Sequence, residues 1–289
     1  MSAFSQVRAF ARDIKLSHTV FALPFALATT VLVHRASPVS PAQWGWILLA
    51  MVGARSSAMG FNRLVDRKLD AANPRTAQRE IVAGRLQVGW AWALTVGAAA
   101  LLVLAAGMLH RHALYASPLV LGVLWGYSLA KRFTAWCHIW LGVALGLSPV
   151  SAWLALTGTV APPAVLLSVV VLTWVAGFDV LYALQDRIYD QAAGLRSVPA
   201  VLGARGALLL SAALHVVTVA ALAALPSLVP LGPAYWVGVA AIAAILVWEH
   251  RIVGPDDHSR MNEAFFLANS LVSVIFLGAV LAAGAPASP

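Results

Sequence analysis

The sequence predicts an all-α, polytopic membrane protein with about nine transmembrane helices. Its composition supports this class, because 61% of the 289 residues are hydrophobic and only 10% carry a charged side chain. Soluble globular domains carry roughly 25% charged residues, so this chain has too few to cover a water-facing surface. The mean hydropathy of +0.84 agrees with this reading. We therefore expect the apolar surplus to face lipid.

Long runs without Asp, Glu, Lys or Arg give the positions of the helices. Four such runs cover residues 16–34, 36–54, 86–110 and 112–130, and a span needs roughly 20 apolar residues to cross about 30 Å of hydrocarbon. Runs 133–178 and 206–248 are each divided by glycine and proline residues into two helices, and a last run follows residue 263. The predicted helices are centred near residues 26, 51, 98, 121, 147, 174, 214, 240 and 274.

The basic residues predict the orientation. When the loops are assigned alternately to the two sides, sixteen of the nineteen basic residues fall on one side, two on the other, and Arg55 lies inside a helix. The positive-inside rule then places the N-terminus in the cytoplasm, and an odd number of helices places the C-terminus outside. The net charge of +8 comes from these short loops and forms no solvated basic patch. We therefore expect a lipid bilayer and no nucleic acid as partner, and we infer no protein partner.

Two predicted helices end in acidic clusters on the cytoplasmic side: the second ends with Asn62-x3-Asp66-x3-Asp70, and the sixth ends with Asp186-x3-Asp190. Residues four apart lie on one face of a helix, where like charges repel by a few tenths of a kcal/mol. A hard divalent cation reverses that cost, because Mg²⁺ prefers oxygen ligands and uses one or two carboxylates together with substrate phosphates. The spacing thus favours two clusters that hold a diphosphate through Mg²⁺.

Basic residues accompany both clusters: Arg75 and Arg79 follow the first, and Arg196 follows the second. Arginine binds phosphate oxygens bidentately, so these side chains suit a diphosphate. The clusters also match each other at an offset of 120 residues, which suggests an internal repeat. An alternative is that these are ordinary interfacial loops whose basic residues serve topology alone, but this does not explain the duplicated carboxylate spacing.

Two ionisable residues lie deeper in the predicted helices. Arg55 precedes Asn62 by seven residues, and Asp179 precedes Asp186 by seven. Seven residues return to nearly the same helix face about 10 Å further along. An ionisable group at that depth suggests a functional site. Either Arg55 and Asp179 pair with each other, or they line a pocket below the diphosphate in which Arg55 holds an acidic acceptor.

Together these motifs resemble the UbiA superfamily of membrane aromatic prenyltransferases. The resemblance covers essentially the whole chain, as a single domain over residues 1–289. Besides the first cluster, it depends on the sequence motifs Arg75-Thr76-Ala77-x-Arg79 with Gly84-Arg85, Tyr182-x3-Asp186-x3-Asp190, Tyr127-x3-Lys131, and KLSHTVFALPF at residues 15–25. One departure is visible, because many members carry Asn-Asp where this chain has Asn62-Arg63.

The resemblance implies a bundle around a central cavity that opens sideways to lipid, with cap loops near residues 63–86 and 186–205. It implies transfer of a polyprenyl group from its diphosphate to an aromatic acceptor, in the bacterial cytoplasmic (inner) membrane and with the active site facing the cytoplasm. The expected Mg²⁺ ligands are Asn62, Asp66, Asp70, Asp186 and Asp190. The residues expected to bind substrate or assist the reaction are Arg55, Arg75, Arg79, Tyr127, Lys131, Asp179, Tyr182 and Arg196.

The acceptor is left open at this point. An aromatic acid such as 4-hydroxybenzoate, used for ubiquinone, is the first choice, and 1,4-dihydroxy-6-naphthoate, used for menaquinone, is the second. Both carry a carboxylate, so Arg55 does not separate them. A membrane transporter is an alternative from another class, but transporters usually bind substrate near the midplane of the membrane, whereas most charge here lies at one surface.

Overall fold

A computed structural model describes residues 2–14, 21–255, 257, 260–261 and 264–284, so residues 15–20 of the segment 15–25 lie outside the described residues. Within these ranges every regular element is helical, which confirms the all-α prediction. The elements in chain order are α1 (Ala3–Asp13), α2 (Leu23–Ala36), α3 (Pro41–Ala72), α4 (Val88–Leu109), α5 (Arg111–Ala130), α6 (Cys137–Thr157), α7 (Pro162–Tyr182), the 3₁₀ turn η2 (Ala183–Asp186), α8 (Arg187–Ala192), α9 (Val198–Ala224), η3 (Leu225–Ser227), α10 (Ala234–Ile252), the π-helical turn η4 (Ala264–Ala268) and α12 (Asn269–Ala282).

The predicted helix positions agree with these elements. Each of the nine predicted centres falls inside a helix, from residue 26 in α2 to residue 274 in α12. Seven helical segments of the described chain are long and apolar enough to cross a membrane, and α2 is a shorter apolar helix of 14 residues. The chain is therefore an integral membrane protein by its helices, while the exact number of nine spans stays a prediction.

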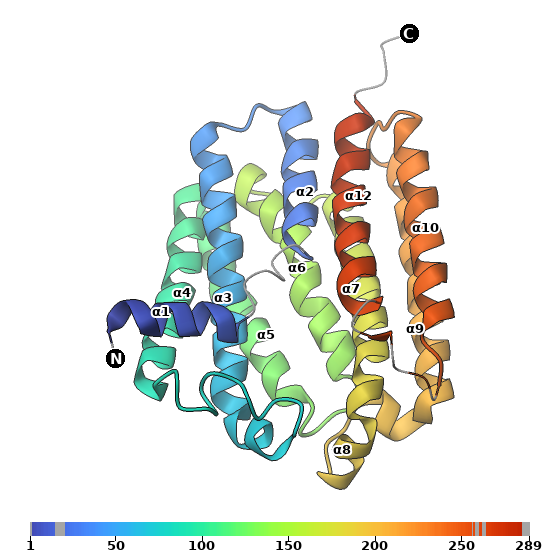
Figure 1. The fold of residues 1–289 in the computed structure, drawn as a ribbon. Coiled ribbons are helices and arrows are strands. Elements are labelled where there is room, and N and C mark those ends of the chain that lie inside the picture. Colours follow the sequence, from blue (N-terminus) through green and yellow to red (C-terminus); the bar gives the residue numbers. More distant parts are fainter. Residues whose placement is uncertain (1, 15–20, 256, 258–259, 262–263, 285–289) are drawn as a thin grey trace.

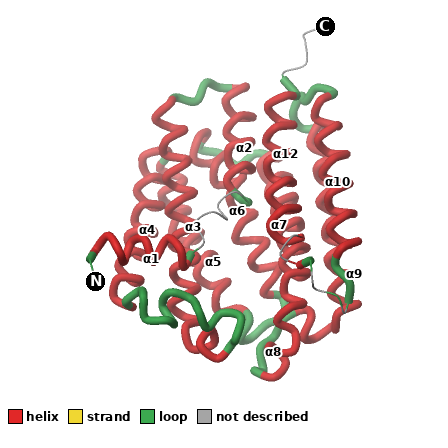
Figure 2. The backbone as a smooth tube through the Cα atoms, viewed as in Figure 1, coloured by secondary structure: helices red, strands yellow, loops and turns green. Residues whose placement is uncertain are grey.

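The long helices run side by side, and α1 lies across them (Figure 1). The loop that joins α3 to α4 lies at the same end of the bundle as α8, and Figure 2 shows it as the longest green segment there. Residues 63–72 of the first predicted cap loop belong to α3, so the loop itself covers residues 73–87. This arrangement places the ends of α3 and α7, with both acidic clusters, at one end of the molecule.

The core surrounds α7. Trp174 of α7 is fully buried, and its ring lies 5.1 Å from that of Phe25 of α2. Phe25 in turn stacks on Phe276 of α12, with ring centroids 4.6 Å apart. The indole N–H of Trp174 donates to Asn269 Oδ1 at 2.9 Å, which satisfies a polar group that would be costly to bury alone. These contacts fix α2, α7 and α12 relative to one another.

Glycine residues allow neighbouring helices to approach closely. A Cβ atom on Gly142 of α6 would lie only 2.4 Å from the carbonyl oxygen of Leu172 in α7. A Cβ on Gly53 of α3 would lie 2.8 Å from the carbonyl oxygen of Ala98 in α4. Small residues at helix contacts are typical of membrane proteins, where packing rather than the hydrophobic effect holds helices together. The two close contacts thus fix the helices that carry the candidate site.

Candidate active site

The first acidic cluster occupies the last turns of α3. Its spacing of four residues places Asn62, Asp66 and Asp70 along one face of the helix. The amide Nδ2 of Asn62 donates to Asp66 Oδ2 at 2.9 Å. Arg132, which follows α5, forms an ion pair of 2.7 Å with Asp66, and Arg79 forms one with Asp70. Each carboxylate of this cluster therefore has its own arginine.

The second cluster begins where α7 ends. We predicted that one helix carries both Asp186 and Asp190, but α7 ends at Tyr182, Asp186 closes the 3₁₀ turn η2, and Asp190 lies in the short α8. A 3₁₀-helix has three residues per turn, compared with 3.6 in an α-helix, so the side chains that follow it point in a different direction. The two aspartates accordingly meet different cations, Arg75 and Lys131.

The loop after α3 joins the two clusters. Asn73 Oδ1 accepts a hydrogen bond from the backbone N–H of Arg75 at 2.9 Å, a turn typical of asparagine. The Arg75 guanidinium then binds Asp186 through two nitrogen atoms, at 3.0 and 2.6 Å, and Nη1 donates to the hydroxyl of Tyr182 at 3.3 Å. The hydroxyl of Tyr189 donates to the carbonyl of Leu69 at 3.0 Å. The two predicted clusters therefore face each other.

Lys131 completes the set of ion pairs. Its Nζ lies 2.8 Å from Oδ1 of Asp190, whose side chain is fully buried. The other carboxylate oxygen, Oδ2, is buried and accepts no hydrogen bond from the described residues. Burial lowers the pKa of Lys131, but the charge and hydrogen bond of Asp190 outweigh this effect, so the pKa is raised above its usual value. Lys131 is thus cationic at neutral pH.

Arg75 shows the same balance. Burial lowers the pKa of its guanidinium, but the hydrogen bond and charge of Asp186 raise it by more, so the pKa lies above its usual value. The four aspartates of the two clusters are each compensated by one basic side chain, drawn from the loop after α3 and the segment after α5. Removing one of these cations leaves a carboxylate without its partner.

The donor set suits a hard divalent cation, because carboxylate and amide oxygens are the ligands that Mg²⁺ and Ca²⁺ prefer. The buried Oδ2 of Asp190, which lacks a partner, also fits a cation. Among the residues that the structure describes, however, no three His, Cys, Asp or Glu side chains converge closely enough to hold a metal ion. The four carboxylates are instead each paired with a basic side chain, and the metal-ligand assignments stay predictions.

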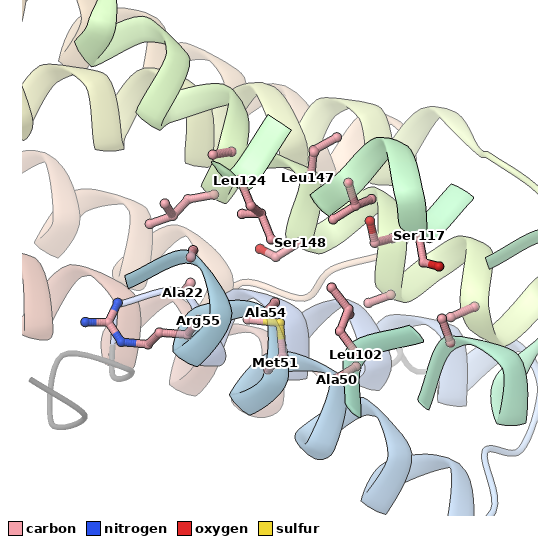
Figure 3. A pocket seen from close by; sticks show the side chains of 18 of the residues that line it. Ala22, Ala50, Met51, Ala54, Arg55, Leu102, Ser117, Leu124, Leu147 and Ser148 are labelled. Atoms are coloured by element: carbon pink, nitrogen blue, oxygen red, sulfur yellow. The ribbon is translucent and has the colours of Figure 1, made fainter. Parts of the chain in front are cut away.

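An apolar cavity with a volume of about 150 Å³ lies below the clusters. Arg55 and Tyr127 line it, together with small and aliphatic residues of α3, α4, α5 and α6. Figure 3 shows Arg55 and Ala22 at one end of this lining and Ser117 towards the other. Among the described residues, Arg55 is the only charged one in the lining, so this part of the cavity combines an apolar wall with one cation.

Tyr127 lies near charged groups of both signs. It is within electrostatic range of the guanidinium groups of Arg55 and Arg63 and of the carboxylates of Asp66 and Asp179. This position connects the cavity to the acidic clusters. Tyr127 is therefore well placed to touch a molecule that reaches from one to the other.

The family follows from comparison with known proteins. A model described as the UbiA prenyltransferase family matches residues 22–271. The chain belongs to this family. A relative named 4-hydroxybenzoate octaprenyltransferase, from Cupriavidus necator, is 29% identical over 283 residues, which cover 94% of this chain and 96% of that protein. Both findings identify the chain as an aromatic prenyltransferase.

Solved UbiA structures have the same fold. The apo structure of a UbiA homologue from Aeropyrum pernix K1 matches with a TM-score of 0.83 and 33% identity, over 92% of this chain and 97% of that one. A UbiA homologue from Archaeoglobus fulgidus bound to DMAPP and Mg²⁺ matches with a TM-score of 0.74 and 19% identity, over 95% and 98%. The helical bundle described here is therefore the UbiA fold.

Three predicted site residues of this UbiA protein lie apart from the ion pairs. Asp179 accepts from His138 at 2.7 Å between Nδ1 and Oδ2, so its partner in the described structure is a histidine. Arg196 lies between α8 and α9, and its Nη1 donates to the carbonyl of Phe133, on the segment after α5, at 2.9 Å. Arg55 lines the cavity, as one of the two alternatives proposed, but Asp179, which that alternative also placed there, is not among the described residues of the lining.

The sequence analysis missed several residues of the site. Arg132 was counted only towards topology, although it adjoins Lys131 at the end of a helix that faces Asp66. His138 carried no recognisable spacing, because its partner Asp179 is 41 residues away. Arg63 was counted towards topology and noted as a departure from the family pattern, but it was given no role in the site. A search for basic residues at the same end of the bundle would have found Arg132 but not His138.

Proposed function

We propose that this UbiA protein transfers a polyprenyl group from its diphosphate to an aromatic acid of the 4-hydroxybenzoate type, with Mg²⁺ as cofactor. The observation that carries the proposal is the set of four ion pairs between the acidic clusters and the surrounding basic residues, placed beside an apolar cavity with one cation. The named activity of the Cupriavidus necator relative and the DMAPP and Mg²⁺ of the Archaeoglobus fulgidus structure support it.

The ion pairs suggest how the substrate binds. Asn62, Asp66, Asp70, Asp186 and Asp190 are the residues that would hold Mg²⁺, which when bound neutralises diphosphate oxygens and so stabilises the leaving group. With the cation as counter-charge for the carboxylates, Arg75, Arg79 and Lys131 would be free to bind phosphate oxygens instead. Every charge then keeps a partner of opposite sign, so the exchange avoids the large cost of a buried unpaired charge.

The reaction itself is a substitution on an aromatic ring. The bond between the prenyl carbon and the diphosphate oxygen breaks, and the electron pair leaves with the diphosphate, where Arg75, Arg79, Lys131 and Arg196 offset the added charge. A ring carbon of the acceptor attacks the allylic cation, and the ring proton then passes to an aspartate carboxylate of the acidic clusters. Arg55 is proposed to hold the carboxylate of the acceptor, and the apolar wall of the cavity keeps water from quenching the cation.

The site is proposed to face the cytoplasm, with the N-terminus on the same side. This follows from the bias of the basic residues, most of which lie on the segments that join the helices at the end of the bundle with the acidic clusters. A protease or a membrane-impermeant label applied to sealed inner-membrane vesicles of known orientation tests it. Labelling of a cysteine placed at Arg187 from the periplasmic side would contradict the orientation.

The decisive experiment is an assay in membranes with a short polyprenyl diphosphate, Mg²⁺ and either 4-hydroxybenzoate or 1,4-dihydroxy-6-naphthoate. Mass spectrometry detects the prenylated product, and EDTA is the metal control. We expect product from 4-hydroxybenzoate that EDTA abolishes. Product from the naphthoate alone would overturn the choice of acceptor, and transfer that persists in EDTA would overturn the role of the metal.

Two variants test the acidic clusters in the same assay. Asp66→Ala and Asp186→Ala are expected to lower transfer by at least about a hundredfold, because each removes a metal-binding carboxylate from one cluster. Asp257→Ala removes an exposed carboxylate outside the clusters and is the matched control. Membrane insertion is checked by fluorescence of a fused reporter. Turnover near that of the wild type in both cluster variants would refute the metal-binding assignment.

A further inference from the structure

Arg63 is a buried cation inside the first acidic cluster. It follows Asn62 on α3, and only 6% of its surface is exposed. A guanidinium group is always protonated in proteins and is costly to bury, so a buried arginine needs contacts that compensate it. The contacts of Arg63 are therefore informative about its role.

Two hydrogen bonds fix the guanidinium in place. Arg63 Nε donates to the backbone carbonyl of Asp13, at the end of α1, at 3.0 Å. Arg63 Nη1 donates to Asn62 Oδ1 at 3.1 Å, while Asn62 Nδ2 donates to Asp66 Oδ2 at 2.9 Å. The amide of Asn62 is thereby oriented, with its oxygen towards the arginine and its NH₂ group towards the carboxylate. An amide oxygen has two lone pairs, so Asn62 keeps one for a further ligand.

Arg63 adds a positive charge beyond those of the four ion pairs. In the described part of the chain no carboxylate lies within ion-pairing distance of it, because Asp66 and Asp70 pair with Arg132 and Arg79. It is nevertheless within electrostatic range of Asp13, Asp70 and Arg79. The charge cannot move away, because both hydrogen bonds are to groups fixed by helices α1 and α3.

We propose that Arg63 is a positioning residue for prenyl transfer, which orients Asn62 and sets the affinity of the first acidic cluster for divalent cations. The inference rests on the proposed function, since it concerns the Mg²⁺ dependence of that reaction. A fixed positive charge repels a second cation and attracts the diphosphate. The cluster should therefore bind Mg²⁺ less tightly than its carboxylates alone would, and should bind diphosphate more tightly when metal is absent.

Three variants separate the charge of Arg63 from its hydrogen bonds. Arg63→Gln keeps a donor for Asn62 but removes the charge, whereas Arg63→Lys keeps the charge but loses the planar, two-point contact. Arg67→Gln is the matched control, because Arg67 is an exposed arginine one turn further along α3. The rate of transfer is measured against Mg²⁺ concentration at saturating prenyl diphosphate, and pyrophosphate binding is measured in EDTA by calorimetry.

For Arg63→Gln we expect the Mg²⁺ concentration at half-maximal rate to fall by roughly threefold to tenfold, because a like charge near the cation has been removed. Pyrophosphate binding in EDTA should weaken by a similar factor. For Arg63→Lys we expect an unchanged Mg²⁺ constant and a lower kcat, because Asn62 is no longer held. Arg67→Gln should match the wild type in each measurement.

The outcomes are distinct. An unchanged Mg²⁺ constant in folded Arg63→Gln would overturn the charge role, and a wild-type kcat in Arg63→Lys would overturn the orientation of Asn62. If Arg63→Gln does not fold, Arg63→Met removes the same charge with an apolar side chain of similar length, and the same shift is expected. A wild-type protein whose transfer does not depend on Mg²⁺ would instead refute the proposed function, whatever the variants do.

Discussion

The ion pair between Lys131 and Asp190 gives the sharpest prediction of stability. Replacing Lys131 by Met leaves the charge of Asp190, which is fully buried, without its partner. Two unit charges 2.8 Å apart attract by roughly 6 kcal/mol at an effective dielectric constant of about 20. The Lys131 side chain is 33% exposed, so water screens part of that attraction. We expect Lys131→Met to lower the free energy of unfolding by about 3 kcal/mol.

The partner variant and the double variant make the prediction quantitative. Asp190→Asn should cost less, about 1 kcal/mol, because the ammonium group of Lys131 can turn to solvent. The double variant Lys131→Met/Asp190→Asn removes both charges and should be more stable than Lys131→Met alone, which corresponds to a coupling energy of about 2 kcal/mol. The free energies are measured by denaturation in a mild detergent with tryptophan fluorescence, and transfer is assayed in parallel.

Stability and activity should separate in this series. The double variant recovers part of the stability lost in Lys131→Met, but it lacks both the carboxylate proposed for Mg²⁺ and the cation proposed for the diphosphate. Transfer should therefore stay at least about a hundredfold below the wild type. Additive losses of stability, with a coupling below about 0.5 kcal/mol, would show that the two residues do not interact. Recovery of transfer in the double variant would refute their role in the reaction.

Two further predictions concern packing and the loop after α3. Gly142→Ala should lower the thermal stability in detergent by several degrees, because the new Cβ would lie 2.4 Å from the carbonyl oxygen of Leu172. Gly97→Ala is the control and should leave the stability unchanged, because nothing lies within 4 Å of a Cβ at that position. Equal stability of the two variants would contradict the close approach of α6 and α7. Arg75→Lys keeps a charge but loses the two-nitrogen contact with Asp186, so the KM for prenyl diphosphate should rise by roughly tenfold, and an unchanged KM would argue against phosphate binding by Arg75.

The fold was predictable from the sequence because hydropathy alone separates lipid-facing helices from loops. The facing of the two acidic clusters was also predictable, since both follow helices that end on one side. The pairing of individual basic and acidic residues within the site was harder to predict from the sequence. The 3₁₀ turn that ends at Asp186 determines which carboxylate pairs with Arg75 and which pairs with Lys131. The spacing of Asp186 and Asp190 in the sequence does not predict that turn.

The contact between His138 and Asp179 is a second feature that could not be predicted from the sequence. The two residues are 41 positions apart and lie on α6 and α7, so their contact depends on how these helices are rotated against each other. That rotation is set by the close approach at Gly142, a residue that a hydropathy pattern reads only as one more small side chain. Sequence spacing describes one helix at a time, whereas this pair is a property of two.

The two halves of the loop between α3 and α4 have different contacts. This difference matters for the proposed exchange, in which the arginines of the loop leave carboxylates for phosphate oxygens. Its second half is fixed to α1: the backbone N–H of Glu80 donates to Asp13 Oδ1 at 2.8 Å, and that of Gln87 donates to Gln6 Oε1 at 2.9 Å. Burial raises the pKa of Asp13, and the hydrogen bond from Glu80 opposes that rise.

The first half of the loop carries Arg75 and Arg79, and its charged side chains contact the acidic clusters instead of α1. If substrate binding requires these two arginines to leave their carboxylates for phosphate oxygens, only this half has to move. The half fixed to α1 limits how far it can go, so the guanidinium groups stay within reach of the clusters while the diphosphate is exchanged. The uneven attachment therefore suits a loop that has to open for substrate and return to the same ion pairs after each turnover.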